Sequence, residues 1–265
     1  MELYARPCRS AAFAKVIMLL LTALPYSPWS EKARWALDHH RLEYREEEHL
    51  PVLGDIKLRV RLRKPRGRVT VPVLYDGRTY LSDSFDIAQY ADKLGGGPRL
   101  FPDDKLAEIV AWNQRSEAAM AAGRALLMLA SANNKDVALA ALPPGVPPAL
   151  KPLLLPVAKK GIELFIAKYR MRDGEGSHKD VLLRELDALK SELSGKRYLL
   201  GDTFSYADIV MAVAVQIVSP VDERYMKKLP GADAVDNSEL ARRYPSLIEW
   251  RDELYEKHRR PAAAA

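Results

Sequence analysis

The chain has 265 residues, 48% of them hydrophobic and 29% charged, with 14 glycines and 18 prolines, which excludes a disordered chain, a collagen-like repeat and a simple coiled coil. Its single cysteine, Cys8, excludes an intramolecular disulfide scaffold and a multi-cysteine zinc site, and favours a reducing, cytoplasmic location. The formal net charge of +6 is spread along the chain among charges of both signs, and no apolar stretch approaches the roughly 18 residues of a membrane-spanning helix, so we expect no membrane insertion.

The first expected element is the apolar run Val16–Leu21, which suits a buried parallel strand because turn residues follow it at 25–28. Basic residues before the run also resemble the start of a signal peptide, but no A-x-A-like cleavage site follows, and we favour the strand. Residues 1–14 are then an N-terminal extension with little structure, for which a targeting role stays open.

Short strands alternate with helices up to about residue 94. A helix is expected at Ser30–His40, and Asp76-Gly77 is a strong hairpin signal between two short strands. The other elements are a strand at Leu42–Arg45, then a variable stretch with room for one helix, strands at Val71–Tyr75 and Arg78–Leu81, and a helix at Ser84–Leu94. This order predicts a mixed sheet with a parallel pair and a closing hairpin, covered by helices.

The second half of the chain is expected to be all helical, with the boundary near residues 95–103. A long helix is predicted at Leu106–Ala132, and further helices at about 157–172, 178–193, 206–218 and 245–258. Six prolines within 143–156 predict a semi-rigid, partly extended segment there. Its leucines need burial, so the segment is either a lid over a substrate site or a loop packed on its own helices.

Five motifs follow one another along the chain and together resemble those of the cytosolic glutathione transferases. They occupy residues 25–30 (PYSPWS), 32–37 (KARWAL), 64–74 (KPRGRVTVPVL), 81–87 (LSDSFDI) and 200–209 (LGDTFSYADI). The resemblance covers roughly residues 15–258. It implies an α/β plus all-α fold: a thioredoxin-like glutathione-binding domain at 15–97, then an all-helical domain at 103–260 that holds the electrophile site.

The turn around Ser27 resembles the family's serine-type or cysteine-type active site. Ser27 follows the first strand and precedes a helix, where free N–H groups and the positive helix end favour an anion. The resemblance implies that its hydroxyl donates to the sulfur of glutathione and stabilises the thiolate. Ser27 as a simple helix cap is one alternative, and Tyr26 as the hydroxyl donor is another.

Two further motifs resemble the parts of the family that hold glutathione. Val71-Pro72 resembles the cis-proline step, which implies that the Val71 backbone pairs with the cysteinyl part of glutathione. Asp83-Ser84 resembles the acidic-serine pair that receives the γ-glutamyl group, with Asp83 facing the ammonium and Ser84 the carboxylate. A plain helix cap at Asp83-Ser84 and an ordinary trans proline at Pro72 remain the structural alternatives.

A basic run occupies residues 57–68, with seven cations and no acid. It lies where the family's second helix borders the glutathione site, so one or two cations are expected to meet a glutathione carboxylate, and Lys64 and Arg68 are best placed. Most of the others are expected to be solvated. The run contains no aromatic residue, which argues against nucleic-acid binding.

The motif at 200–209 has the spacing of a helix capping box, with Ser205 and Asp208 as its two members and Phe204 and Ile209 placed for a hydrophobic staple. We assign it a role in folding and none in catalysis.

The resemblance implies a glutathione S-transferase that attacks hydrophobic electrophiles with the glutathione thiolate, a detoxification reaction in which glutathione is the co-substrate and no other cofactor is needed. The five histidines show no spacing for metal ligands, so no metal site is expected. A glutathione-dependent peroxidase or isomerase, and a non-catalytic scaffold, are the alternatives; the hydroxyl of Ser27 favours catalysis. The family also implies a homodimer.

Overall fold

A computed structural model describes residues 18–50, 53–132, 134–140, 142, 145–229 and 237–261. Its sheet has the strand order β2-β1-β3-β4, formed by β1 (Leu19–Ala23), β2 (Tyr44–Glu48), β3 (Val73–Tyr75) and β4 (Tyr80–Leu81). Strands β1 and β2 are parallel, whereas β3 is antiparallel to both β1 and β4. The predicted mixed sheet is thus confirmed. Strand β1 extends to Ala23, two residues past its expected end, while residues 16–17 and the extension 1–14 lie outside the described residues.

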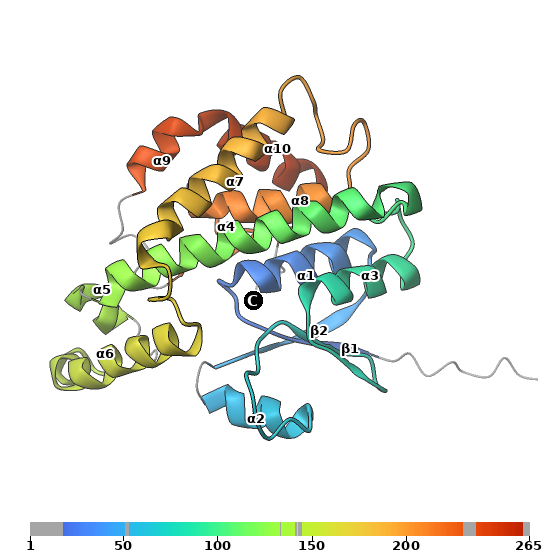
Figure 1. Cartoon of the computed structure of the whole chain (residues 1–265). Helices are drawn as coiled ribbons and strands as arrows, with labels where there is room; N and C mark the ends of the chain where they lie inside the picture. The colour runs from blue at the N-terminus through green and yellow to red at the C-terminus, as the bar shows by residue number, and fades with distance from the viewer. Residues whose placement is uncertain are drawn as a thin grey trace, which may run out of the picture.

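Helices cover both faces of the sheet. Helices α1 (Pro28–His39) and α3 (Ser84–Leu94) lie side by side on one face, and α2 (Leu53–Arg61) lies on the other (Figure 1). Helix α1 begins at Pro28, two residues before its expected start, because Ser27 caps it and proline suits the first helical position.

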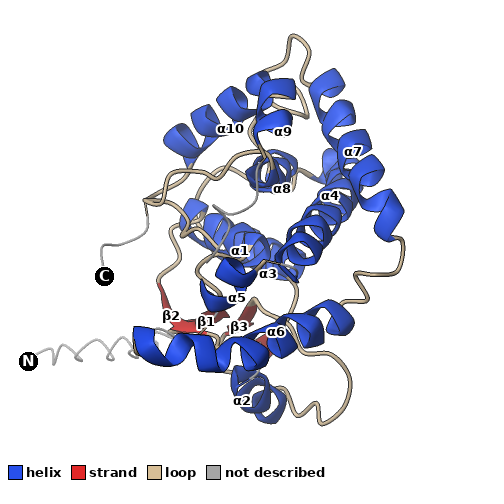
Figure 2. Cartoon of the chain, turned by 90° about the vertical axis from the view of Figure 1, so that its left-hand side faces the viewer, coloured by secondary structure: helices blue, strands red, loops and turns tan. Residues whose placement is uncertain are grey.

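The described residues after Leu94 are mainly helical, as Figure 2 shows, and the predicted combination of a thioredoxin-like part and a helical part is confirmed. The helices are α4 (Leu106–Ala132), α5 (Lys135–Ala140), α6 (Lys151–Lys168), α7 (His178–Glu192), α8 (Tyr206–Ala214), α9 (Ser238–Arg243) and α10 (Pro245–His258). Short 3₁₀ turns lie at Asp103–Lys105, Pro148–Leu150, Glu175–Ser177 and Val215–Ile217. Helix α8 is the centre of the core, because all its residues are buried and it packs against α1, α4 and α10.

The capping box of α8 is confirmed. Oδ2 of Asp208 accepts hydrogen bonds from the Ser205 N–H at 2.9 Å and from its hydroxyl at 3.0 Å, while Oδ1 accepts from the Leu199 N–H at 2.8 Å. Burial raises the pKa of Asp208 to about 6, against the effect of these donors. The motif therefore fixes the start of the most buried helix.

The prediction of an extended segment at 143–156 is wrong from Pro148 onward. A 3₁₀ turn covers Pro148–Leu150, and α6 begins at Lys151, about six residues before its expected start. Pro148 and Pro152 stand in first turns, where a helix has no partner for the N–H that proline lacks, so only Pro156 interrupts the helical bonds. Burial of all the leucines is wrong too, since Leu153 is 73% exposed. Residues 143 and 144 lie outside the described residues.

The last residue of α10, His258, connects this helix to α1. The carbonyl of His258 accepts a hydrogen bond from Nε1 of the fully buried Trp35, at 3.2 Å. The ring of His258 stacks on Phe204, with centroids 4.0 Å apart and an angle of 7° between the planes, and its Nε2 contacts the Tyr198 hydroxyl at 2.9 Å. The C-terminal part of the chain thus contacts the helix that carries Ser27.

We expect His258 to stay neutral down to about pH 4. Burial, followed by the charge of Lys257, lowers its pKa to about 4. Between this pKa and the ordinary value near 6.5, the unfolded chain binds a proton that the folded chain does not, so this residue makes the fold less stable as the pH falls through that window. An NMR titration of the His258 ring should show a midpoint near 4. A midpoint above 6 would contradict this assignment. As a second test, the free energy of unfolding in urea should fall less between pH 7 and pH 5 for His258→Gln than for the wild type.

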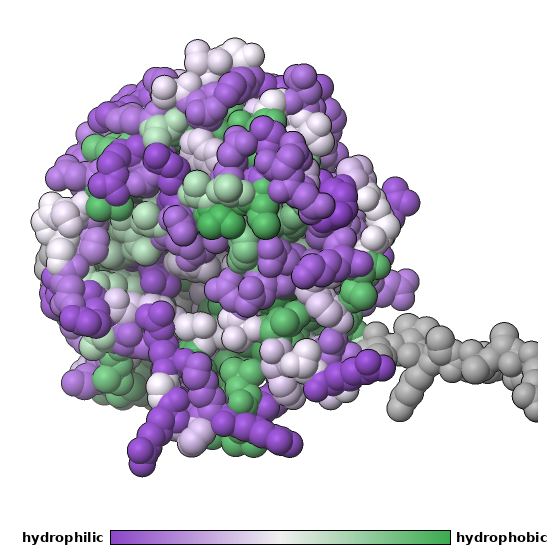
Figure 3. Space-filling view, turned by 45° about the vertical axis from the view of Figure 1, so that its right-hand side comes forward, coloured by the Kyte–Doolittle hydropathy of each residue, from purple (hydrophilic) through white to green (hydrophobic). Residues whose placement is uncertain are grey.

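The face of the molecule in Figure 3 mixes hydrophilic residues with separate small hydrophobic patches. Among the described helices, none is both long enough and apolar enough to cross a bilayer.

Candidate functional site

Strand register brings the predicted site segments together at one end of the sheet, where β1 ends and β3 begins. Thr22 of β1 pairs with Val73 of β3, so the end of β1 lies beside the start of β3. The turn with Ser27 follows β1, and Val71-Pro72 precedes β3. Helix α3 starts at Ser84 and packs against α1, which begins next to Ser27.

Ser27 caps helix α1, which was the alternative to a catalytic role. Its Oγ accepts a long hydrogen bond of 3.4 Å from the Ser30 N–H, and the residue is 9% exposed. A hydroxyl that accepts through a lone pair keeps its own proton for a second hydrogen bond. Capping and donation to a ligand are therefore compatible at Ser27.

Tyr26 lies next to Ser27 and is half-buried. Burial raises its pKa, and the charge of Glu48 raises it further. The Glu48 charge that raises this pKa would also disfavour a thiolate bound beside the phenol, because like charges repel.

The Val71-Pro72 peptide bond is cis, as predicted. The hydrogen-bonded ladder between β1 and β3 begins at Val73, so the Val71 backbone lies just outside the ladder, at the site edge.

Asp83 and Ser84 begin α3. Oδ1 of Asp83 accepts a hydrogen bond from the Phe85 N–H at 2.8 Å, which makes Asp83 the helix cap, and its exposed carboxylate has a second oxygen to offer. Ser84 is buried, and its carbonyl accepts a bond of 3.3 Å from the Tyr206 hydroxyl of α8. The start of α3 is thus held firmly by the helical part of the chain.

Lys64 and Arg68 are both exposed, but they face different surroundings. Lys64 follows the end of α2, where its N–H donates to the Arg59 carbonyl at 2.9 Å. The Cζ of Arg68 lies 5.1 Å from the ring centroid of Tyr169, directly after α6. Arg68 therefore lies at the junction of the two halves of the chain.

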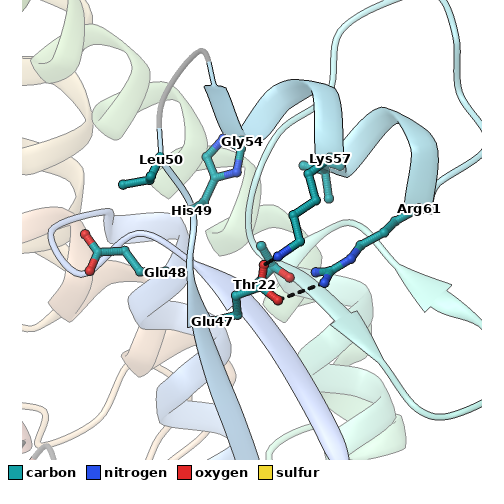
Figure 4. A pocket seen from close by; sticks show the side chains of 9 residues that line it. Thr22, Glu47, Glu48, His49, Leu50, Gly54, Lys57 and Arg61 are labelled. Atoms are coloured by element: carbon teal, nitrogen blue, oxygen red, sulfur yellow. Dashed lines mark hydrogen bonds and ion pairs between the residues drawn. The ribbon is translucent and has the colours of Figure 1, made fainter.

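A small cavity of about 200 Å³ lies between α2 and the ends of β1 and β2, and none of the predicted site residues lines it. Two cations of the basic run, Lys57 and Arg61, reach from α2 to Glu47 on β2 at 2.6 and 2.9 Å (Figure 4). Both cations thus share one carboxylate of the protein. The cavity is small and crossed by its own ion pairs, so we do not place a substrate there.

A polar network that sequence reasoning missed connects α1 to α4 behind the site turn. Nζ of the fully buried Lys32 donates to Glu117 at 2.7 Å and to Ser116 at 2.8 Å, and Nε1 of Trp29 donates to the other oxygen of Glu117 at 2.6 Å. Burial lowers the pKa of Lys32, and Glu117 opposes the shift. Lys32 and Trp29 lie in the recognised motifs, but no sequence pattern singles out Glu117.

A second missed group also includes Trp29, through the face of its ring. The guanidinium carbon of Arg124 in α4 is 4.5 Å from the Trp29 ring centroid and 4.0 Å from that of Tyr169. Three elements distant in sequence meet here, so no local pattern could have found the group.

Comparison with known proteins gives consistent results for both halves of the chain. Residues 21–99 match the model of the glutathione S-transferase N-terminal domain, and residues 137–253 match that of the C-terminal domain. A probable glutathione S-transferase of Nicotiana tabacum is 24% identical over 230 residues, which cover 86% of this chain and 79% of the relative.

Solved structures share the fold. A glutathione S-transferase of Ceriporiopsis subvermispora in complex with glutathione matches with a TM-score of 0.63 and 18% identity, over 93% of this chain and 100% of that one. A glutathione transferase of Phanerochaete chrysosporium matches with a TM-score of 0.62 and 19% identity, over 92% and 99%. With family models matched over both halves, the chain belongs to the glutathione S-transferase family of enzymes.

Proposed function

We propose that this enzyme binds glutathione at the edge formed by the start of α1, the Val71-Pro72 step and the start of α3, and that Ser27 activates the glutathione thiol. The observation that carries the proposal is the place of Ser27: its hydroxyl stands at the N-terminus of α1, in a turn whose sequence resembles the family's site. A donated hydrogen bond and the positive helix end both favour a thiolate over a thiol.

The neighbouring segments suit the rest of glutathione. The Val71 backbone, outside the strand ladder, pairs with the cysteinyl backbone as an added strand would. The Asp83 carboxylate faces the γ-glutamyl ammonium, while Ser84 and the N–H groups of the first turn of α3 receive its carboxylate. Lys64 and Arg68 attract the second carboxylate of glutathione, that of its glycyl end. The Pro72 ring forms part of the surface beside the cysteinyl backbone.

The proposal extends to the second substrate and to the assembly. A hydrophobic electrophile binds against the helical part of the chain, the thiolate attacks it, and the product is a glutathione thioether. Two copies form a homodimer in the cytoplasm. These three statements are supported by the family resemblance alone.

Replacing Ser27 with alanine should lower kcat roughly ten- to a hundredfold, because a hydrogen bond to a charged group contributes about 1.5–3 kcal/mol. The KM for glutathione should change little, since Val71, Asp83 and Ser84 still hold the peptide. The measurement is steady-state conjugation of a neutral electrophile, together with an ultraviolet titration of the bound thiolate, whose pKa should rise in the variant.

Tyr26→Phe is the matched control and should keep nearly full activity with an unchanged thiolate titration. An active Ser27→Ala combined with an inactive Tyr26→Phe would move the hydroxyl donor to Tyr26. A thermal unfolding curve accompanies each variant, because loss of the helix cap costs about 1 kcal/mol by itself.

A further inference from the structure

Arg124 is a half-buried cation held between two aromatic rings beside the proposed thiol-activating turn. The ring centroids of Trp29 and Tyr169 lie 4.5 and 4.0 Å from its Cζ. Trp29 follows Ser27 by two residues in the first turn of α1, and Tyr169 follows α6 directly. The guanidinium is thus fixed where α1, α4 and the end of α6 meet, next to the place where the thiolate would form.

Within the described part of the chain, no carboxylate pairs with Arg124, and its buried Nε has no hydrogen-bond partner. Glu117 is the acid whose charge acts on it, but both of its oxygens already accept from Lys32 and Trp29, at 2.7 and 2.6 Å. Arg68, which also lies against Tyr169, adds a second positive charge. Burial lowers the pKa of Arg124, yet a guanidinium stays protonated in proteins.

Another arginine on the same helix shows how this chain neutralises a stacked cation. The Cζ of Arg115 lies 5.4 Å from the ring centroid of Trp112, and its Nη1 donates to the buried carboxylate of Glu185 at 2.8 Å. Arg124 has the aromatic contacts of Arg115 without the acid. An unpaired, partly desolvated cation is unfavourable, and an anionic ligand would reduce that cost.

We propose, on the basis of the glutathione transferase function proposed above, that Arg124 binds an anionic group, such as a carboxylate, of an aromatic electrophile. A guanidinium stacked by rings has its N–H donors directed outward in its own plane, the geometry that binds a carboxylate through two hydrogen bonds. The rings of Trp29 and Tyr169 supply an apolar surface for the aryl part of the ligand. The second substrate is thus an aryl electrophile with a negative charge.

A matched pair of probes tests this: 4-chloro-3-nitrobenzoate and its uncharged methyl ester. In both, the thiolate sulfur forms a bond to the ring carbon that carries chlorine, chloride leaves with the bonding electron pair, and the thiol proton goes to solvent. The two probes therefore differ in charge but undergo the same substitution reaction. Conjugation of each is measured with the wild type, Arg124→Met and the control Arg115→Met.

We expect Arg124→Met to lower kcat/KM for the benzoate roughly ten- to a hundredfold, the loss of a charge-assisted hydrogen bond, and to change the ester less than about twofold. The KM for glutathione should stay the same, and Arg115→Met should not separate the two probes. Equal losses for both probes would overturn the proposal in favour of a packing role. A raised KM for glutathione with both probes would also overturn it, because Arg124 would then bind a carboxylate of glutathione.

Direct binding separates failure of this proposal from failure of the proposed function. The unreactive 3-nitrobenzoate is titrated by calorimetry into the wild type, Arg124→Met and Arg124→Lys in the presence of S-methylglutathione. Binding that is weakened at least tenfold in Arg124→Met and partly kept in Arg124→Lys supports the site even if neither probe is conjugated. Binding that is absent from the wild type, or equal in all three proteins, overturns it.

Discussion

Replacing Arg259 with methionine is expected to lower the free energy of unfolding by about 3–5 kcal/mol, because it leaves a buried carboxylate without its main partner. The Glu31 side chain is 0% exposed, and the Arg259 side chain, 1% exposed, donates to it at 2.7 Å. The same guanidinium also pairs with Asp38. Arg34 would be the partner left to Glu31, at 3.6 Å. Urea unfolding followed by circular dichroism measures the change.

Two companion variants make this expectation specific. Arg260→Met changes an exposed neighbour and should stay within about 0.5 kcal/mol of the wild type. The double variant Glu31→Gln/Arg259→Met removes both charges and should recover much of the loss. An Arg259→Met protein as stable as Arg260→Met would show that the buried pair does not hold the C-terminal segment to α1.

Replacing Glu117 with alanine should also cost about 3–5 kcal/mol at neutral pH, and more than replacing its partner Lys32 with methionine. The two side chains differ in exposure, 0% for Lys32 and 41% for Glu117. Loss of the acid strands an ammonium in the interior, whereas loss of the lysine leaves an acid that water can still solvate. Chemical unfolding of the two single variants gives the comparison.

The stranded ammonium adds a pH signature. Burial already lowers the pKa of Lys32, and removal of Glu117 takes away the main opposing effect. The folded variant then releases a proton that the unfolded chain keeps up to about pH 10.4, so its stability should rise with pH across that window. A Glu117→Ala protein whose deficit is the same at pH 7 and pH 9.5 would contradict this account, and Lys32→Met is the control without the signature.

Local signals predicted the elements that depend on local chemistry. The bounds of α3 and α4 match the prediction, because Asp83 and Gly95 mark the ends of α3 and no proline interrupts the alanine- and leucine-rich sequence of α4. The cis bond before β3 and the capping box of α8 were also predictable, since each belongs to a short motif.

The start of α6 and the chemistry around Trp29 were not predictable, for different reasons. The prolines near α6 predict a break in the helix, but Pro148 and Pro152 occupy first turns, where the missing N–H has no helical partner to lose. Arg124 lies within α4 and Tyr169 directly after α6, neither belongs to a sequence motif, and only the fold brings them to one place. Contacts between distant elements leave no trace in a single sequence.

The contact between Arg259 and Glu31, which are 228 positions apart, has a consequence for how the protein is made. A ribosome releases the N-terminal sheet and α1 long before Arg259 is synthesised. The carboxylate of Glu31 therefore lacks this partner while the residues between the two emerge. The thioredoxin-like half therefore reaches its final stability only after Arg259 has been synthesised. For the same reason, a chimera that joins this half to the helical half of a relative inherits an unpaired buried acid unless an arginine is supplied at the equivalent place.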